Sequence, residues 1–337
     1  MATATQYNPN TELNARLLAA GASKTVYALV TPETEAAKRA TFGRFIPEQA
    51  EYFDMFREAW TGKQDALHEE FFDTWYEWSK PVVFFARKHY PYYYPTAGAS
   101  EALRQLIFDM AAHSHNSPVI HIFAGEYEGY KAMAEAAGLS VMEHDRSAWP
   151  DQAVTISEGD RFFISQPSAI DGNIWSKFND FLATMPANSV VADITYVGAV
   201  SEVRDRFELD STSVSNIVFS LSKPFGGYYD RIGGVFCRTE NLALFGNRWF
   251  KNLTSLAVGT KLLQHNDVFS LPKKYRFAQT RALVHASSEL RMDFLPSDVF
   301  ILGTAAPTNT GIGRYLSRAG KPRICITPAM SKMIGTA

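Results

Sequence analysis

The stretch from Ser220 to Gly234 constrains this chain most, because it sets a single lysine between two apolar runs. Residues 216–219 before it and 235–237 after it predict two short buried strands, with Lys223 on the turn between them. A lysine ammonium is costly to bury and its pKa falls there, which is the property that a Schiff-base lysine needs. The alternative is an edge lysine that reaches water beside a glycine turn.

Two segments offer groups that suit an anion. Ser220, Ser222 and Arg231 surround Lys223 and supply hydroxyl and guanidinium donors. The small residues 96–100 precede a predicted helix from Glu101 to about residue 113, and a helix N-terminus presents free backbone N–H groups to an anion. For the second segment, an ordinary helix cap is the competing interpretation.

A carboxylate ends one of the predicted strands. Residues 189–193 form an apolar run that closes on Asp193, and an unpaired charge buried there is costly unless it faces a cation. Further strands are expected over 118–124, 140–144 and 161–165, with a helix over 127–137. This alternation predicts a mainly parallel, doubly wound sheet with its ligands at the carboxyl ends of the strands.

These motifs, in this order, resemble the fold-type I pyridoxal-phosphate enzymes, the aspartate aminotransferase superfamily. The pattern Ser220-x-Ser222-Lys223-x-Phe225-Gly226, followed by Arg231-x-Gly233, is similar to the lysine signature of that family. The resemblance spans about residues 95–330. It implies an α/β fold with a mainly parallel seven-stranded sheet in a large domain and a smaller α/β domain.

The resemblance also implies a role for each matching residue. Lys223 is the catalytic residue, which forms a Schiff base with pyridoxal 5'-phosphate, and Arg323 binds the substrate carboxylate. Tyr127 stacks on the cofactor ring, Asp193 pairs with its nitrogen and Tyr196 bonds its phenolic oxygen. The cofactor phosphate is assigned to Gly98, Ala99, Ser100, Ser220, Ser222 and Arg231.

Some positions depart from the family pattern. Ala169 stands where relatives usually have an asparagine, so that Asn173 or Gln166 substitutes for it or the substrate geometry differs. Tyr228 replaces a usual glycine. A second substrate arginine is not identified, and the candidates for it are Arg204, Arg206 and Arg248.

The chemistry implied is that of an enzyme acting on an amino acid through an external aldimine and a Cα carbanion, with transamination to a 2-oxo acid as the default. Elimination, replacement or cyclisation by the same machinery is the alternative, and a cofactor-bound sensor without turnover is a third hypothesis. The resemblance further implies a homodimer.

Composition bounds the remaining choices. The 337 residues are 46% hydrophobic, which allows one or two domains. A net charge of −2 gives no basic surface of the kind that binds nucleic acid, and the sequence shows no apolar run of bilayer-spanning length. We expect no secretory leader, because residues 1–6 lack its basic and apolar regions. Two cysteines, expected to be core thiols, favour a reducing compartment over a disulfide framework, so we expect a soluble cytoplasmic protein. No metal is expected.

The predicted domains are residues 1–80, a divergent helical region that contributes to the small domain, 81–250, the large cofactor-binding domain, and 251–337, a shortened small domain. Helices are expected over 11–20, 247–263 and 281–291, and strands over 299–303 and 322–327. The aromatic residues between Thr34 and Trp78 are interpreted as packing surface rather than a ligand cage. The tyrosines at 90–94 either pack or line the pocket mouth.

Overall fold

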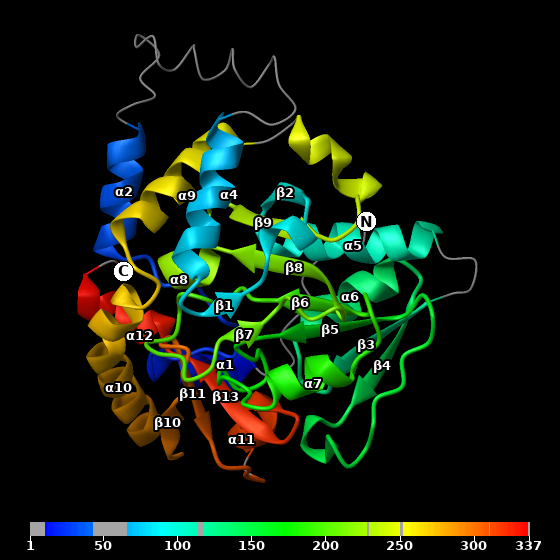
Figure 1. Cartoon of the computed structure of the whole chain (residues 1–337). Coiled ribbons are helices and arrows are strands. Elements are labelled where there is room, and N and C mark those ends of the chain that lie inside the picture. The colour runs from blue at the N-terminus through cyan, green and yellow to red at the C-terminus, as the bar shows by residue number, and fades with distance from the viewer. Residues whose placement is uncertain are drawn as a thin grey trace, which may run out of the picture.

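The computed structural model describes residues 11–42, 66–113, 118–227, 229–249, 252–309 and 311–335. Its main element is a seven-stranded sheet in the order β2-β9-β8-β6-β5-β3-β4 (Figure 1). The strands are β2 (Tyr92–Ala97), β3 (Val119–Phe123), β4 (Ser140–His144), β5 (Arg161–Ser165), β6 (Val190–Asp193), β8 (Val214–Ser220) and β9 (Ile232–Cys237). The five strands from β8 to β4 are parallel and β9 is antiparallel to both neighbours, which confirms the predicted mainly parallel sheet.

Consecutive side chains of the parallel strands enter two separate cores. Phe162 packs on one face of the sheet and Phe163 on the other, and Val190 and Val191 divide in the same way. Both faces are therefore covered, which explains why β6 reads as a continuous apolar run rather than an alternating one.

Helices of the large sheet cover these faces. α5 (Ala99–His113) contacts β2, β8 and β9, and α6 (Glu128–Ala136) packs against β4 and α5. α4 (Ala66–Ser79) packs against α9 (Leu253–His265). The other helices here are α7 (Phe178–Thr184) and the single-turn α8 (Ser222–Phe225).

Aromatic side chains join α4 to the sheet. Trp75 stacks on Phe219 of β8 with ring centroids 4.1 Å apart, and Phe72 meets Phe236 of β9 edge-on at 5.1 Å. Phe71, Phe72, Trp75 and Trp78 are all buried, which confirms their interpretation as packing surface. The aromatics at 53, 56 and 60 lie outside the described residues.

The tyrosines at 90–94 also belong to the packing rather than to a pocket. Tyr90 and Tyr94 are fully buried. The Tyr90 hydroxyl donates to the carbonyl of Val214 at 3.1 Å, and the Tyr94 hydroxyl accepts from the backbone N–H of Asn241 at 3.1 Å. The Tyr93 hydroxyl donates to the Glu69 carboxylate at 2.7 Å.

A second sheet is antiparallel and lies below the first in Figure 1, beside α10. Its order is β10 (Phe294–Pro296), β11 (Leu302–Ala305), β13 (Lys321–Cys325) and β12 (Ser317–Arg318). The accompanying helices are α10 (Ser270–Leu290), α11 (Gly311–Leu316) and α12 (Thr327–Ile334). α1 (Thr11–Ala19) contacts α10, and Ser23 forms an isolated antiparallel bridge with Cys325.

Some predicted boundaries were wrong. The expected helix over 247–263 is interrupted, because a 3₁₀ segment covers Leu242–Arg248 and α9 begins only at Leu253. The helix expected over 281–291 begins eleven residues earlier, at Ser270. The strand expected over 299–303 begins at Leu302, because Val299 forms only an isolated bridge with Val200 and residues 300–301 form a turn.

Smaller elements complete the described chain. β1 (Val83–Phe84) and β7 (Phe207–Glu208) form a parallel pair, and α2 (Pro32–Phe42) packs against α9. Two 3₁₀ segments cover Arg87–His89 and Arg146–Ala148. α1 lies by the small sheet, whereas α4 packs on the large one (Figure 1). The assignment of residues 1–80 to the small domain stays a prediction.

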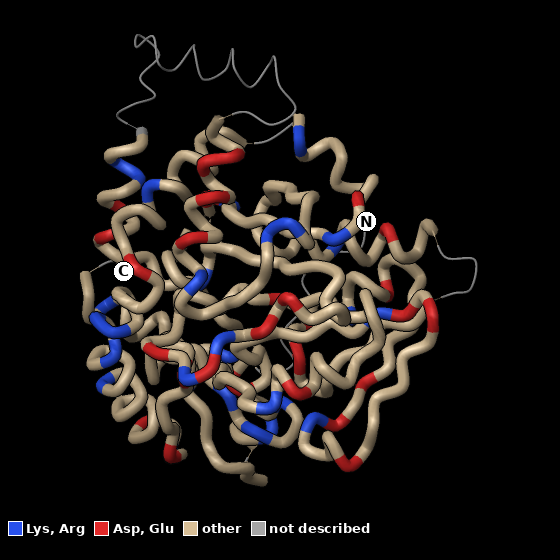
Figure 2. Tube along the Cα trace, in the orientation of Figure 1, with Lys and Arg blue, Asp and Glu red and all other residues tan. Residues whose placement is uncertain are grey.

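Charges of both signs are interspersed along the chain (Figure 2). Within the described residues, no helix combines the length and the apolar character needed to cross a bilayer. Cys237 and Cys325 are unpaired and buried, as expected of core thiols. Burial raises the pKa of the Cys237 thiol to about 12, so this thiol stays protonated at neutral pH.

Candidate active site

A cavity of about 910 Å³ opens at the carboxyl edge of the large sheet. Ser165, Asp193 and Ser220 are the last residues of β5, β6 and β8, and all three line this cavity. Parallel strands bring their carboxyl ends to one edge of a sheet, which is where open α/β sheets bind ligands. The topology alone therefore gathers three polar side chains that are separated by up to 55 positions.

Lys223 lies in α8, on the turn between β8 and β9, where the sequence predicted it. Its Nζ points into the cavity region and donates to the carbonyl of Val26 at 2.7 Å. Burial lowers the pKa of the Lys223 amine, and the positive charges of Arg323 and Arg231 lower that pKa further. The result is an amine that loses its proton more readily than an exposed lysine does.

A cluster of donors lies beside Lys223 and forms an anion cradle, which we define as Ala99, Ser100, Ser220, Ser222 and Arg231. All five residues line the cavity, and Ala99 and Ser100 begin the fifteen-residue helix α5. The Ser220 hydroxyl accepts from the backbone N–H of Ser222 at 3.1 Å. The cradle therefore combines a helix N-terminus, three serine hydroxyls and a guanidinium.

Gly98 supports the cradle rather than lining it. Its φ is +76°, and a Cβ added there would lie 3.2 Å from Nη2 of Arg231. Arg231 itself holds a left-handed φ of +52°, a conformation that costs free energy in a non-glycine residue, and its Nη2 donates to the carbonyl of Ala97. The backbone thus fixes the guanidinium at the cavity wall.

Asp193 is buried and fully hydrogen-bonded at the base of the cavity. One carboxylate oxygen accepts from the backbone N–H of Thr195 at 3.0 Å and from its hydroxyl at 2.5 Å, and the other accepts from the Tyr130 hydroxyl at 2.9 Å. Burial nevertheless raises the pKa of Asp193. A cationic partner in the cavity would stabilise the ionised carboxylate and so lower the pKa of Asp193 again.

Tyr127 and Tyr130 have different places. The ring of Tyr127 lines the cavity and is 38% exposed, as expected for a ring that could stack on a ligand. Tyr130 is fully buried, and its ring contacts that of Tyr127 edge-on, with 5.4 Å between the ring centroids. Its hydroxyl donates to the Asp193 carboxylate. The sequence did not reveal this second role.

Glu126 is a buried acid that the sequence analysis missed. Its carboxylate accepts from the Ser165 hydroxyl at 2.5 Å and from the Ser165 backbone N–H at 3.3 Å. Burial raises the pKa of Glu126 to about 7, and the Asp193 carboxylate contributes in the same direction. An acid three residues beyond β3 was the only signal in the sequence.

Arg323 lies in β13 and reaches the cavity from the small sheet. The side chain is buried, and its Nη1 donates to the carbonyl of Ala169. Its Nε has no hydrogen-bond partner among the described residues, and burial lowers the pKa of the guanidinium to about 10. Burial raises the pKa of the neighbouring Tyr196 hydroxyl to about 12. Both side chains line the cavity.

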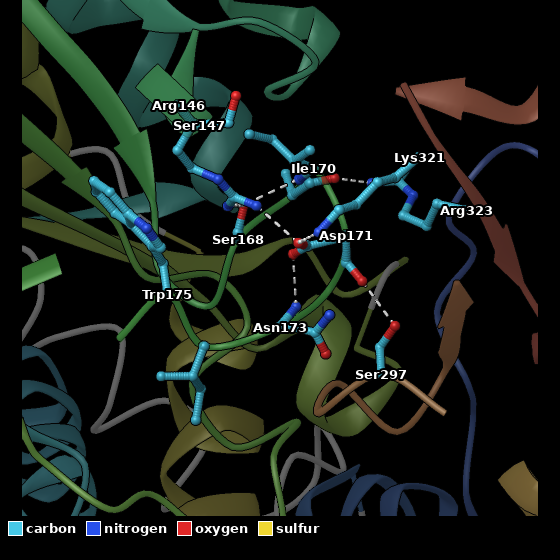
Figure 3. A network of polar contacts seen from close by, with 12 residues as sticks. Arg146, Ser147, Ser168, Ile170, Asp171, Asn173, Trp175, Ser297, Lys321 and Arg323 are labelled. Carbon is cyan, nitrogen blue, oxygen red and sulfur yellow. Dashed lines mark hydrogen bonds and ion pairs between the residues drawn. The ribbon is translucent and has the colours of Figure 1, made fainter. Parts of the chain in front are cut away.

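The loop that carries Ala169 is held by an ion pair (Figure 3). Arg146 donates to the Ser168 hydroxyl and to the Asp171 carboxylate, each at 2.7 Å. Asp171 also accepts from the backbone N–H of Asn173 at 3.1 Å, and its carbonyl accepts from the hydroxyl of Ser297 at 2.7 Å. This network links the loop to Ser297, which follows β10 of the small sheet that carries Arg323.

Comparisons with known proteins identify the fold. No family model matches the chain, and no curated protein matches its sequence. Among solved structures, a probable N-succinyldiaminopimelate aminotransferase of Thermus thermophilus is similar, with a TM-score of 0.64 at 16% identity over 96% of each chain. The chain has the fold of the fold-type I enzymes.

Two further structures agree on that fold. A mutant aspartate aminotransferase of Thermus thermophilus has a TM-score of 0.64 at 12% identity, over 99% of this chain and 98% of the other. A PLP-bound C-S lyase of Staphylococcus hominis has a TM-score of 0.63 at 11% identity, over 100% of this chain and 96% of the other. At these identities the likeness establishes the fold alone.

The two side chains suggested as substitutes for the missing asparagine are engaged elsewhere. The Gln166 side chain exchanges hydrogen bonds with the backbone of Trp175, and Asn173 accepts from the backbone N–H of Asp298 at 3.0 Å. Neither side chain lines the cavity, whereas Ser165 and Ala169 do. Tyr228 lies outside the described residues.

Other parts of the cavity lining come from segments to which the sequence assigned no role. Residues 22–27, Tyr315 and Arg318 line it, together with Asn14, Leu17 and Leu18 of α1. The three candidates for a second substrate arginine, Arg204, Arg206 and Arg248, do not line the cavity. Among the described residues, no cluster of His, Cys, Asp and Glu is suited to hold a metal ion.

Proposed function

We propose that this chain is an aminotransferase that uses pyridoxal 5'-phosphate and acts on an amino acid. One observation carries the proposal: Lys223, Asp193 and the anion cradle converge on a single cavity at the carboxyl edge of a fold-type I sheet. These are the groups that an aldehyde, a pyridine nitrogen and a phosphate on one molecule require.

The residues present fit that cofactor. The phosphate would bind the cradle, where a glycine at 98 leaves the guanidinium of Arg231 in place. Asp193 would face the ring nitrogen, Tyr127 the ring face and Tyr196 the phenolic oxygen. Gly233 allows the same close packing from β9, because a Cβ there would lie 2.7 Å from Cα of Gly98.

When bound, pyridoxal phosphate supplies an electron sink for a bond broken at the α-carbon of the amino acid. Arg323 would bind the α-carboxylate and so orient that carbon over the site. The Lys223 amine, with its lowered pKa, would take and return the α-proton. Tyr130 and Thr195 would keep Asp193 aimed at the ring nitrogen.

Elimination is the second candidate. Two observations favour it: Ala169 occupies the usual asparagine position, and the fold is similar to that of a C-S lyase. Replacement and cyclisation use the same groups and belong to the same proposal. A 2-oxo acid would then be a product or would not take part, rather than being the second substrate.

A homodimer in the cytoplasm remains part of the proposal, on the strength of the resemblance and the cysteine content. Sedimentation equilibrium would test the dimer: a mass of about twice 37.6 kDa is expected, and a single-chain mass contradicts it.

The deciding experiment records the absorption spectrum of the purified chain with pyridoxal phosphate while amino acids are added. Transamination predicts that an amino acid converts the cofactor band and that a 2-oxo acid restores it. Release of ammonia and an oxo acid without that exchange identifies elimination. No cofactor band in the wild-type chain, or an unchanged band in Lys223→Ala, contradicts the proposal.

A further inference from the structure

The charges that line the cavity do not balance. Five cations line it, Lys24, Lys223, Arg231, Arg318 and Arg323, against two carboxylates, Glu128 and Asp193. If the chain binds its cofactor as proposed, the phosphate is assigned to Arg231 together with the N-terminus of α5 and the cradle hydroxyls, and the α-carboxylate is assigned to Arg323. Lys223 is used in the covalent attachment and Asp193 faces the ring. Two cations, Lys24 and Arg318, then remain, and Glu128 is the one remaining carboxylate of the cavity lining.

Arg318 is already engaged. Its Nη2 donates to the Glu128 carboxylate at 2.6 Å, and its Nη1 donates to the carbonyl of Glu126 at 3.2 Å. Glu128 is largely exposed, with 75% of its side chain accessible, so water screens its charge. Arg318 thus adds a fixed and weakly neutralised positive charge to this end of the cavity.

Lys24 has no such partner. Among the described residues no carboxylate forms an ion pair with its Nζ, which sits 4.2 Å from the centroid of the Tyr315 ring. The Tyr315 hydroxyl donates to Asn14 at 2.8 Å, and this bond fixes the ring under the ammonium. Burial lowers the pKa of Lys24, the charge of Glu128 opposes this effect and that of Arg318 adds to it.

The backbone places Lys24 beside β13, the strand that carries Arg323. The preceding residue, Ser23, exchanges two 2.8 Å backbone hydrogen bonds with Cys325, which is two residues beyond Arg323 on β13. Two residues after Lys24, the carbonyl of Val26 accepts from Lys223. A ligand held by Arg323 and reaching Lys223 therefore lies beside the segment that carries Lys24.

We propose that Lys24, assisted by Arg318, binds a second anionic group at the end of the substrate side chain, so that the substrate is an acidic amino acid. A carboxylate and a phosphate share the required chemistry, since both accept charge-assisted hydrogen bonds from an ammonium. The amino-acid part of this inference rests on the proposed function, whereas the anion site does not.

Unreactive ligands test the site without turnover. The full chain with pyridoxal phosphate is titrated calorimetrically with glutarate, 3-phosphonopropionate and pentanoate, the last of which has only one anionic group. At least one of the two dianions is expected to bind roughly tenfold or more tightly than pentanoate, as a charged hydrogen bond implies. The stronger dianion identifies the terminal group.

Variants assign the effect to Lys24. Lys24→Met is expected to remove the preference for dianions and to leave pentanoate binding unchanged, whereas Lys24→Arg keeps the preference. Lys80→Met is the matched control, because Lys80 also sits over a tyrosine ring, 4.9 Å from that of Tyr76, but lies outside the cavity.

Equal affinity for all three ligands, or dianion binding by Lys24→Met as tight as in the wild-type chain, overturns the inference. The cofactor band is recorded in the same samples. If that band is absent while dianions still prefer the wild-type chain over Lys24→Met, the proposed function fails and the anion site stands. If the band is present but Lys24→Met binds the dianions as the wild-type chain does, the anion site fails and the proposed function stands.

Discussion

The two walls of the cavity differ in how the chain builds them. One wall, here called the sheet wall, consists of strand ends and the starts of helices, as in Asp193, Ser220 and Ser100. The other, the terminal wall, consists of residues 22–27, Tyr315 of α11 and Arg318 of β12. The sheet wall holds the groups proposed for the cofactor, and the terminal wall holds those proposed for the substrate side chain.

The difference shows where chemistry can vary in such a fold. Residues of the sheet wall are tied to the topology, because a shift in register would move them out of the common edge. The terminal wall is attached to the small sheet through Ser23 and Cys325 and carries no strand of the large sheet. Substrate selection can therefore change there without disturbing the cofactor site. The predictions below test this division.

Loss of the sheet-wall lysine should have the largest effect. Lys223→Ala removes the group proposed to attach the cofactor and move the proton, so turnover of an amino acid should fall by about 10²–10⁴-fold. Steady-state assays measure it, with Lys80→Met as the control that keeps full activity. Turnover by Lys223→Ala close to the wild-type rate would remove the sheet wall from the chemistry.

Glu126, the buried acid behind the sheet wall, should make the free energy of unfolding depend on pH. The pKa of Glu126 is raised by burial from 4.5 to about 7, so the protonated acid favours the folded state. Its contribution is fully present below pH 4.5 and is lost as the pH rises through 7, by about 3 kcal/mol. Glu126→Gln should remove that loss in urea unfolding at pH 5 and pH 7.5.

The exposed Glu143→Gln serves as the control for Glu126, because Glu143 pairs with Lys131 at the surface. An identical pH dependence in the wild-type chain and Glu126→Gln would contradict the assignment of a raised pKa.

Arg323 joins the two walls and should affect substrate rather than cofactor. Arg323→Lys keeps a positive charge but loses the planar fork that binds a carboxylate through two hydrogen bonds. The KM for an amino acid should rise roughly 10- to 100-fold, with the affinity for pyridoxal phosphate unchanged. Equal losses in cofactor affinity would show that the two walls are not separable.

A glycine pair gives the smallest and sharpest test. Gly98→Ala should weaken pyridoxal phosphate binding by about 1–2 kcal/mol, because its φ of +76° is strained for alanine and its Cβ would press on Arg231. Gly138 has a similar φ of +73°, but an added Cβ would meet nothing within 4 Å. Gly138→Ala should therefore lower the stability of the fold and leave the affinity for pyridoxal phosphate unchanged. Fluorescence titration of both variants separates contact from strain.

The sequence predicted the strands that end at the sheet wall well because their signals are local. The apolar runs that became β3, β5 and β6 are buried on both faces, and each ends within one residue of its predicted end. The lysine motif and the start of α5, predicted at Glu101 and found at Ala99, depend on short contiguous patterns. Their convergence on one cavity then follows from the parallel topology.

The terminal wall had no comparable signal. Lys24 is placed by pairing between Ser23 and Cys325, about 300 positions apart, and no local pattern encodes that contact. Glu126 and Tyr130 matter through buried hydrogen bonds to Ser165 and Asp193, which depend on tertiary structure. The start of α10 was missed because Pro272 argues against a helix, although a proline is tolerated in a first turn.

The most direct test of the account is to find which lysine carries the cofactor. Both Lys24 and Lys223 line the cavity, so borohydride reduction of the chain with pyridoxal phosphate, followed by peptide mass mapping, distinguishes the two walls. The account predicts label on Lys223 and none on Lys24. Label on Lys24, or no label on either lysine, would contradict it.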